Sequence, residues 1–132
     1  MQLNEISSRI IKAAINVHNQ LGPGLLESVY QRCMIIELEE MGLSCEAEVP
    51  VKIKYKNHDV SDEAFRIDLL VEGKVIIELK SVEQIKDIHK KQLLTYLRLN
   101  NLSLGLLINF NEIMLKNGIT RIVNNFKGDV LP

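Results

Sequence analysis

Two short apolar segments that carry charged residues constrain the fold of this chain more than any other feature. Residues 65–71 and 75–79 are dense in branched and aliphatic side chains, and residues 72–74, which include a glycine, separate them. This pattern predicts two buried strands joined as a hairpin. Asp68 lies inside the first segment and Glu78 inside the second. Because burial of a lone carboxylate is costly, the two charges indicate a cleft, a bound metal ion, or both.

The spacing of the charges limits how they can meet. Glu78 and Lys80 lie two residues apart, so their side chains share one face of a strand. A three-residue loop over residues 72–74 places Asp68 opposite Glu78, whereas a two-residue loop turns Asp68 to the other face. A bulge or bend at Asp68 would also bring the two acids together. An exposed strand end with a weak ion pair is the alternative explanation for the same residues.

Gathered in one pocket, these three side chains suit the hydrolysis of phosphodiesters. Asp68 and Glu78 offer the oxygen ligands that Mg²⁺ (or Mn²⁺) prefers, and Mg²⁺ keeps several waters and binds phosphate oxygens. The ion acidifies a water and stabilises the charge that develops on phosphorus. Lys80 would orient or deprotonate the water, or neutralise the pentacoordinate phosphate.

The rest of the chain alternates between helical and strand patterns. Apolar residues that recur at intervals of three and four predict three amphipathic helices. Alternating or continuous apolar residues predict the remaining strands. The order of these elements predicts one α/β domain over the whole chain. The predicted helices span residues 5–20, 25–41 and 85–99, and the further strands span 48–55, 102–110 and 119–123, with a turn at 57–59.

Composition narrows the functional classes. The 132 residues, of which 46% are hydrophobic and 25% charged, suit one soluble globular domain. With no spanning apolar segment and no secretory leader, the sequence predicts a cytoplasmic protein without membrane association. Cys33 and Cys45 lack the spacing of zinc ligands, which argues against structural zinc. A net charge of -1 means that any attraction to nucleic acid is local.

Three blocks in this order resemble the PD-(D/E)xK nuclease superfamily, and more closely the small bacterial and archaeal GxxExxY proteins. The namesake block is GLLESVY at residues 24–30, and the metal-site block runs from RID at 66–68 to IELK at 77–80. A third block, KQLLTY at 91–96, is similar to the Gln-x-x-x-Tyr motif of the RecB-like branch. The resemblance covers most of the chain. It implies a restriction-endonuclease-like α/β core, with a central mixed sheet flanked by helices and two helices at the N-terminus.

The resemblance also implies roles for single residues in a Mg²⁺-dependent nuclease that acts on DNA, with RNA left open. Asp68 and Glu78 would hold the metal ion, Glu27 would supplement its coordination, and Lys80 would act on the water or the transition state. Glu27 has an alternative role as a first-turn acid that the helix dipole favours. Tyr30 follows one turn later, and we predict that it contacts nucleic acid.

The third block lies on a predicted helix beside the site. By the resemblance, Gln92 and Tyr96 position substrate or water, and their spacing of four places both on one helical face. Tyr96 also suits a core position. Lys86, Lys90 and Lys91 gather positive charge on this helix, either as a track for phosphates or as an ordinary solvated face.

Two other functions fit the same sequence. The short chain and near-neutral charge suit a binding module that cleaves nothing alone and acts as a subunit of a larger complex. A structural homodimer, in which the apolar helical faces of about the first forty residues pair between protomers, is compatible with either function.

Overall fold

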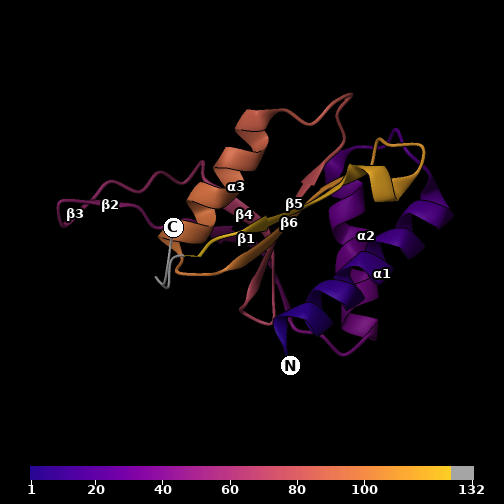
Figure 1. Cartoon of the computed structure of the whole chain (residues 1–132), viewed down its shortest axis with the longest axis horizontal. Helices are drawn as coiled ribbons and strands as arrows, with labels where there is room; N and C mark the ends of the chain where they lie inside the picture. Colours follow the sequence, from indigo (N-terminus) through magenta and orange to yellow (C-terminus); the bar gives the residue numbers. More distant parts are fainter. Residues whose placement is uncertain (126–132) are drawn as a thin grey trace.

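Two helices open the chain and pack on the same side of the molecule. The structure is a computed structural model that describes residues 1–125; it begins with α1 (Leu3–Leu21) and α2 (Glu27–Glu40), shown together in Figure 1. Both agree with the predicted helices to within two residues at each end. Their apolar stripes are buried against the sheet, and these residues are Ile6, Ile10, Ala13, Ala14, Val17, Tyr30, Met34 and Leu38.

Five strands form one mixed sheet, as the resemblance implied. The strands are β1 (Cys45–Pro50), β4 (Arg66–Val71), β5 (Val75–Lys80), β6 (Leu104–Asn109) and β7 (Ile119–Val123), and they lie in the order β1-β4-β5-β6-β7. Only the β5–β6 pair is parallel. A parallel pair needs a crossover connection, and α3 (Asp87–Leu99) supplies it. A short 3₁₀ helix, Leu115–Gly118, leads into β7.

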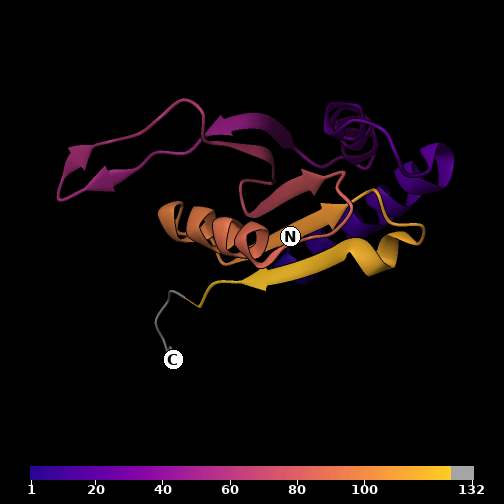
Figure 2. The same ribbon diagram turned by 90° about the horizontal axis from the view of Figure 1, so that it is seen from above.

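The sheet is buried on both faces, which explains why its central strands are continuous apolar runs. One core cluster joins the sheet to α1 and α2, and a second, smaller cluster joins it to α3. Figure 2 shows α3 on one side of the sheet, and α1 and α2 at its other side. β5 and β6 pass between the two clusters, and all their residues except Lys80 are buried.

The predicted strand over residues 48–55 is present only in part, because residues 48–50 belong to β1 and the chain then leaves the sheet. Glu48 has a φ of 55°, and Pro50 has no N–H to donate to a neighbouring strand. The chain continues into a narrow hairpin of β2 (Lys54–Tyr55) and β3 (His58–Asp59), which projects from the sheet in Figures 1 and 2. We call residues 51–65 the arm.

The turn of the arm also differs from the prediction. It lies at Lys56 and Asn57 rather than at residues 57–59, and both residues have positive φ, of 49° and 68°. Two consecutive residues with positive φ form the type I′ turn that matches the twist of a hairpin. Asn57, which the prediction included, is suited to this backbone, and the turn begins one residue before the predicted range, at Lys56.

The predicted pairing of apolar helical stripes between protomers is wrong. These stripes face the sheet of their own chain, and residues such as Ile6 and Met34 are 0% exposed. A second copy would therefore have to use another surface. Among the described residues, no helix combines the length and hydropathy needed to cross a membrane.

Candidate active site

The backbone ladder between β4 and β5 stops halfway along both strands. Residues 69–71 pair with residues 75–77, and beyond this point β4 continues beside β1 while β5 continues beside β6. The connection is the three-residue alternative, residues 72–74, and its register brings Asp68 opposite Glu78. We call the place where the two strands separate, defined by Asp68 and Glu78, the fork.

The two carboxylates of the fork take over hydrogen bonds that a continuous ladder would have made. The backbone N–H of Asp68 donates to Glu78 Oε2 at 3.0 Å, and the N–H of Leu79 donates to Asp68 Oδ2 at 2.8 Å. Every buried side-chain N or O atom in the described residues has a hydrogen-bond partner. Asp68 Oδ1 and Glu78 Oε1 have no such partner among them, so both oxygens reach solvent and are free to bind a ligand.

A bend at Asp68, which was predicted as another way to bring Asp68 and Glu78 together, is present as well. Leu69 packs in the core cluster of α1 and α2, yet Ile67, two residues away, packs in the cluster of α3. Side chains two apart in a regular strand share a face, so the pleat is interrupted between them. In the neighbouring strand Glu48, with its positive φ, lies at the matching level.

The carboxylates of Asp68 and Glu78 repel one another, and burial removes part of their hydration. Burial and the charge of Asp68 raise the pKa of Glu78 to about 8. Burial, with the charges of Glu48 and Glu27, also raises the pKa of Asp68. The positive charge of Lys80 acts in the opposite direction on both acids, and does not cancel these effects. A divalent cation at the fork would favour the ionised form of both carboxyls.

A cavity of about 170 Å³ opens beside the fork. Gln31 on α2 lines this cavity. Its Nε2 donates to Glu48 Oε2 at 2.8 Å and to the backbone oxygen of Asp68 at 2.9 Å. Three carboxylates therefore line one cavity, and the Gln31 amide joins the carboxylate of Glu48 to the backbone of Asp68. The lining residues are Glu27, Ser28, Gln31, Glu48, Asp68 and Leu79.

Glu48 and Gln31 line the cavity but were not among the predicted site residues. Gln31 lies four residues after Glu27, so the helical spacing that places both on one face was a usable signal. Glu48 had no local signal, since it reaches the site only because β1 pairs with β4. Its exposed position in a short polar segment looks like an ordinary surface acid.

The loop after Lys80 is fixed from two sides. Glu27 Oε2 accepts the N–H of Ser81 at 3.2 Å, and Ser81 Oγ donates to the oxygen of Leu25 at 2.6 Å. On the other side the buried amide of Asn109 exchanges two hydrogen bonds with the backbone of Val82, at 3.1 and 3.0 Å. Glu27 thus connects the start of α2 to the end of β5.

The donor set fits Mg²⁺ better than a metal that demands a full protein cage. In the described residues, no three His, Cys, Asp or Glu side chains lie close enough to hold an ion together. The predicted trio of Glu27, Asp68 and Glu78 is therefore not gathered, and Glu27 lies at the rim. Mg²⁺ is usually held by one or two carboxylates, with waters and substrate phosphates as its other ligands. Asp68 and Glu78, with one free oxygen each, meet that requirement.

Helix α3 brings Gln92 and Tyr96 to the same side as the acids. Tyr96 is 6% exposed and packs in the core cluster of α3, which agrees with its alternative role as a core residue. Burial and the charges of Glu78 and Asp68 raise the pKa of its hydroxyl, so the hydroxyl also lies within the field of the fork. Gln92 is half-buried on the same helical face.

The lysines of α3 and of its N-cap lie toward the N-terminal end of the helix, whereas Arg98 lies in its last turn. Lys86, Lys90 and Lys91 are exposed, and form no ion pair with any described residue. His89 Nδ1 accepts the N–H of Lys86 at 3.0 Å and so caps the helix. Burial and the charges of Lys80 and Lys86 lower the pKa of His89, which places the ring near the end of β5.

Tyr30 is fully buried, so the prediction that it contacts nucleic acid is wrong. Its side chain is 0% exposed and stacks on Phe110 with ring centroids 4.4 Å apart. The hydroxyl donates to the oxygen of Gly22 at 2.6 Å and accepts the N–H of Leu25 at 3.1 Å. Tyr30 instead holds the turn that delivers Glu27 to the rim of the site.

Comparisons with known proteins agree with this geometry. No curated protein and no solved structure was found to be significantly similar to the chain. A family model described as the PD-(D/E)XK nuclease superfamily matches residues 4–122, a span that covers all three helices and all the strands apart from the first residue of α1 and the last residue of β7. Members of this superfamily generally use divalent metal ions. The chain therefore belongs to the PD-(D/E)XK nuclease superfamily.

Proposed function

We propose that this protein hydrolyses phosphodiester bonds in DNA with the help of Mg²⁺ or Mn²⁺. The fork carries the proposal, because it holds a buried carboxylate, Glu78, and a half-buried one, Asp68, that each present one free oxygen near Lys80 at the end of β5. Buried carboxylates with raised pKa values are costly to maintain, and a bound cation explains why they are there.

Each residue of the site has a distinct task in this proposal. Asp68 Oδ1 and Glu78 Oε1 hold the ion, which supplies an acidified water and stabilises charge on the phosphate when bound. Lys80 forms no ion pair with the described residues, so its ammonium is free to orient the water or to neutralise the phosphate. Tyr96 and Gln92 position the substrate or the water from α3.

We also propose that the protein belongs to the GxxExxY group and to the RecB-like branch of the superfamily. The roles of the namesake residues support this assignment. Gly24 has a φ of 97°, which favours glycine. Glu27 holds the loop after Lys80, and Tyr30 holds the turn before Glu27. All three positions of the motif thus serve the geometry of the fork.

A cleavage assay tests the proposal. Labelled linear, circular and single-stranded DNA, and a matched RNA, are incubated with Mg²⁺ or Mn²⁺ and with a chelator. We expect metal-dependent cleavage of DNA that Glu78→Ala and Lys80→Ala abolish while both variants stay folded. Cleavage that persists in a chelator, or in both variants, would refute the assignment of the fork as the active site.

A binding module that does not cleave is the second candidate. It is favoured by the short chain of 132 residues and its net charge of -1. In this case nucleic acid binds at low salt, where electrostatic attraction is strongest, and no metal ion produces cleavage. Binding by such a module would also survive Glu78→Ala.

A further inference from the structure

The arm carries exposed side chains that the proposed active site does not use. In both views it extends past α3 and away from α1 and α2 (Figures 1 and 2). Lys52, Lys54, Tyr55 and Lys56 lie on its outgoing strand and turn, and all four are exposed. Apart from Val51 and Ile53, which pack in the core cluster of α3, the arm adds little to the core, so its exposed side chains need another explanation.

The arm is ordered by hydrogen bonds along its length. The N–H of Val51 donates to the oxygen of Phe65 at 3.0 Å, and the N–H of Val60 donates to the oxygen of Ile53 at 2.9 Å. The β2–β3 pair and the type I′ turn complete the hairpin. A surface that is ordered before binding loses less conformational freedom when it meets a ligand.

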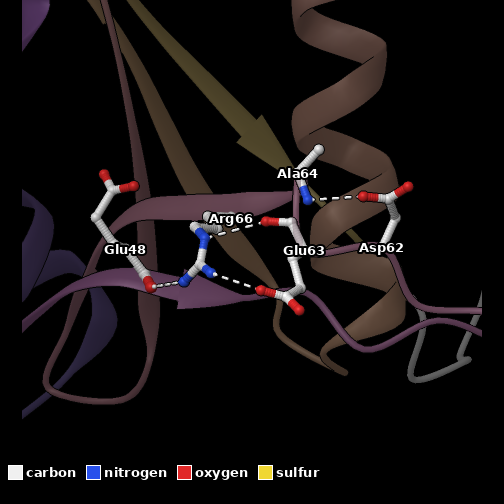
Figure 3. Close-up of polar contacts among 5 residues, drawn as sticks. All are labelled: Glu48, Asp62, Glu63, Ala64 and Arg66. Carbon is white, nitrogen blue, oxygen red and sulfur yellow. Dashed lines mark hydrogen bonds and ion pairs between the residues drawn. The ribbon is translucent and has the colours of Figure 1, made fainter.

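Arg66 connects the base of the arm to Glu48 on β1, as Figure 3 shows. The guanidinium donates to the backbone oxygens of Glu63 at 3.1 Å and of Glu48 at 3.4 Å, and it pairs with the Glu63 carboxylate at 3.8 Å. The carboxylate of Glu48 points away from Arg66 in Figure 3, and it lines the cavity beside the fork. A strand bound along the arm would therefore lead toward the proposed active site.

The arm carries three lysines and three acids, equal in number, and the two sets differ in their contacts. Asp59 accepts the N–H of Ser61 at 2.9 Å, Asp62 accepts the N–H of Ala64 at 2.8 Å, and Glu63 pairs with Arg66. In contrast, the three lysines form no ion pair with any described residue; they are Lys52, Lys54 and Lys56. Asp59 offsets part of this charge, because Lys54 and Lys52 help to lower its pKa.

The exposed aromatic rings of the described chain are confined to the arm. Tyr55 is 65% exposed and Phe65 is 41% exposed. The other described aromatic residues, Tyr30, Tyr96 and Phe110, are 6% exposed or less. The ammonium of Lys56 lies 5.5 Å from the centroid of the Tyr55 ring.

We propose that the arm binds a single-stranded flank of the nucleic-acid substrate, with Tyr55 stacked on a base and the three lysines on phosphates. Aromatic side chains beside lysines are the means by which proteins hold single strands. A peptide could also cover Tyr55, but the free cations favour a polyanion. The inference rests on the proposed nuclease function, since it concerns the same substrate outside the reacting phosphate.

Binding to a labelled oligonucleotide of about 16 nucleotides tests the aromatic contact. The full chain carries Glu78→Gln, and Ca²⁺ replaces Mg²⁺, so that cleavage does not interfere. We expect Tyr55→Ala to weaken binding about 5- to 150-fold and Tyr55→Phe to preserve it, because the ring and not the hydroxyl stacks. Equal affinities for the parent and Tyr55→Ala would overturn the proposal.

A matched pair of triple variants tests the lysines. One variant carries Lys52→Gln, Lys54→Gln and Lys56→Gln; the other carries Lys12→Gln, Lys74→Gln and Lys116→Gln, three exposed lysines outside the arm. Both lose the same charge. The arm variant should lower the slope of log affinity against log salt by up to about 2, as each lost phosphate contact on a single strand removes about 0.7. Equal slopes in the two variants would mean a general charge effect and would reject the proposal.

Fluorescence separates this proposal from the proposed activity. The sequence has no tryptophan, so Tyr55→Trp creates a single reporter on the arm. Its emission should be quenched when the oligonucleotide binds. Quenching without any cleavage by the wild-type protein would support binding by the arm and reject the proposed nuclease activity. Cleavage by the wild type without quenching would support the nuclease activity and reject binding by the arm. Quenching by a peptide but not by an oligonucleotide would also reject the proposal that the arm binds nucleic acid.

Discussion

The two edges of β5 meet their neighbours in different ways. Toward β6, the whole of Val75–Lys80 is paired in a continuous parallel ladder. Toward β4, the ladder covers residues 75–77, and the carboxylates of Asp68 and Glu78 occupy the place where it would continue. One strand therefore supports stability along one edge and presents charged groups along the other. The paired edge keeps the backbone in place while the open edge holds groups that repel one another.

The largest expected effect comes from removing a charge at the open edge. Glu78→Gln keeps the shape of the side chain but removes a proposed metal ligand, so cleavage should fall on the order of 10³-fold. Above about pH 8 the variant should be at least as stable as the wild type, because the repulsion from Asp68 is lost. Initial cleavage rates and urea denaturation measure the two effects.

Glu40→Gln is the matched control, because it removes an exposed acid at the far end of α2. It should leave both cleavage and stability unchanged. If Glu78→Gln cleaved within tenfold of the wild type, the contrast between the two edges of β5 would have no functional meaning.

A substitution at the paired edge of β5 should instead lower the stability of the fold. Leu106→Ala removes a fully buried side chain on β6, directly opposite Ile77 in the parallel ladder. The cavity that remains should lower the free energy of unfolding by about 2–5 kcal/mol. Ile113→Ala, at a side chain that is 87% exposed, should change it by less than about 0.5 kcal/mol. Similar losses in both variants would contradict the importance of the ladder.

The open edge should make stability depend on pH. The unfolded chain releases the Glu78 proton near 4.5, whereas the folded protein retains it up to about 8. Between these values the folded state holds more protons, so stability is highest at the low end and falls as pH rises. Without metal, the fall should be at least about 1.4 kcal/mol, the equivalent of one pKa unit.

Two further measurements test the cause of this pH dependence. Glu78→Gln should flatten the pH dependence, since the titrating carboxyl is gone. Mg²⁺ should raise the melting temperature of the wild type more at about pH 8 than at about pH 5, because the cation binds the ionised pair. A wild-type protein whose stability rises steadily with pH would contradict the buried, repelling pair.

Much of the difference between the two edges of β5 could be predicted from local sequence. The two apolar segments, the glycine-containing loop at residues 72–74 and the spacing of Glu78 and Lys80 predict the hairpin and the shared face. These features depend on neighbours in the chain, which periodicity reports directly. The loop length, and with it the register of Asp68, could be narrowed only to alternatives, because turn type depends on packing as well as on sequence.

The rest depends on contacts between distant segments. Glu48 reaches the cavity through the pairing of β1 with β4, and the burial of Tyr30 depends on Phe110, which lies eighty positions later. The break in the predicted strand at residues 48–55 arises from the backbone at Glu48 and Pro50. A pattern of alternation could not show it, since Val51 and Ile53 continue the alternation after the strand has ended.

The smallest expected effect concerns the end of α3 that faces the fork. His89 Nδ1 accepts the N–H of Lys86, so His89→Ala should lower stability by about 0.5–2 kcal/mol through loss of the cap. His89→Gln should restore it, because glutamine at this position caps helices in the same way. If the ring serves only as a cap, cleavage should follow stability in both variants. Restored stability with lost cleavage in His89→Gln would show that the ring also acts at the open edge, which would add a group from α3 to those contributed by the strands.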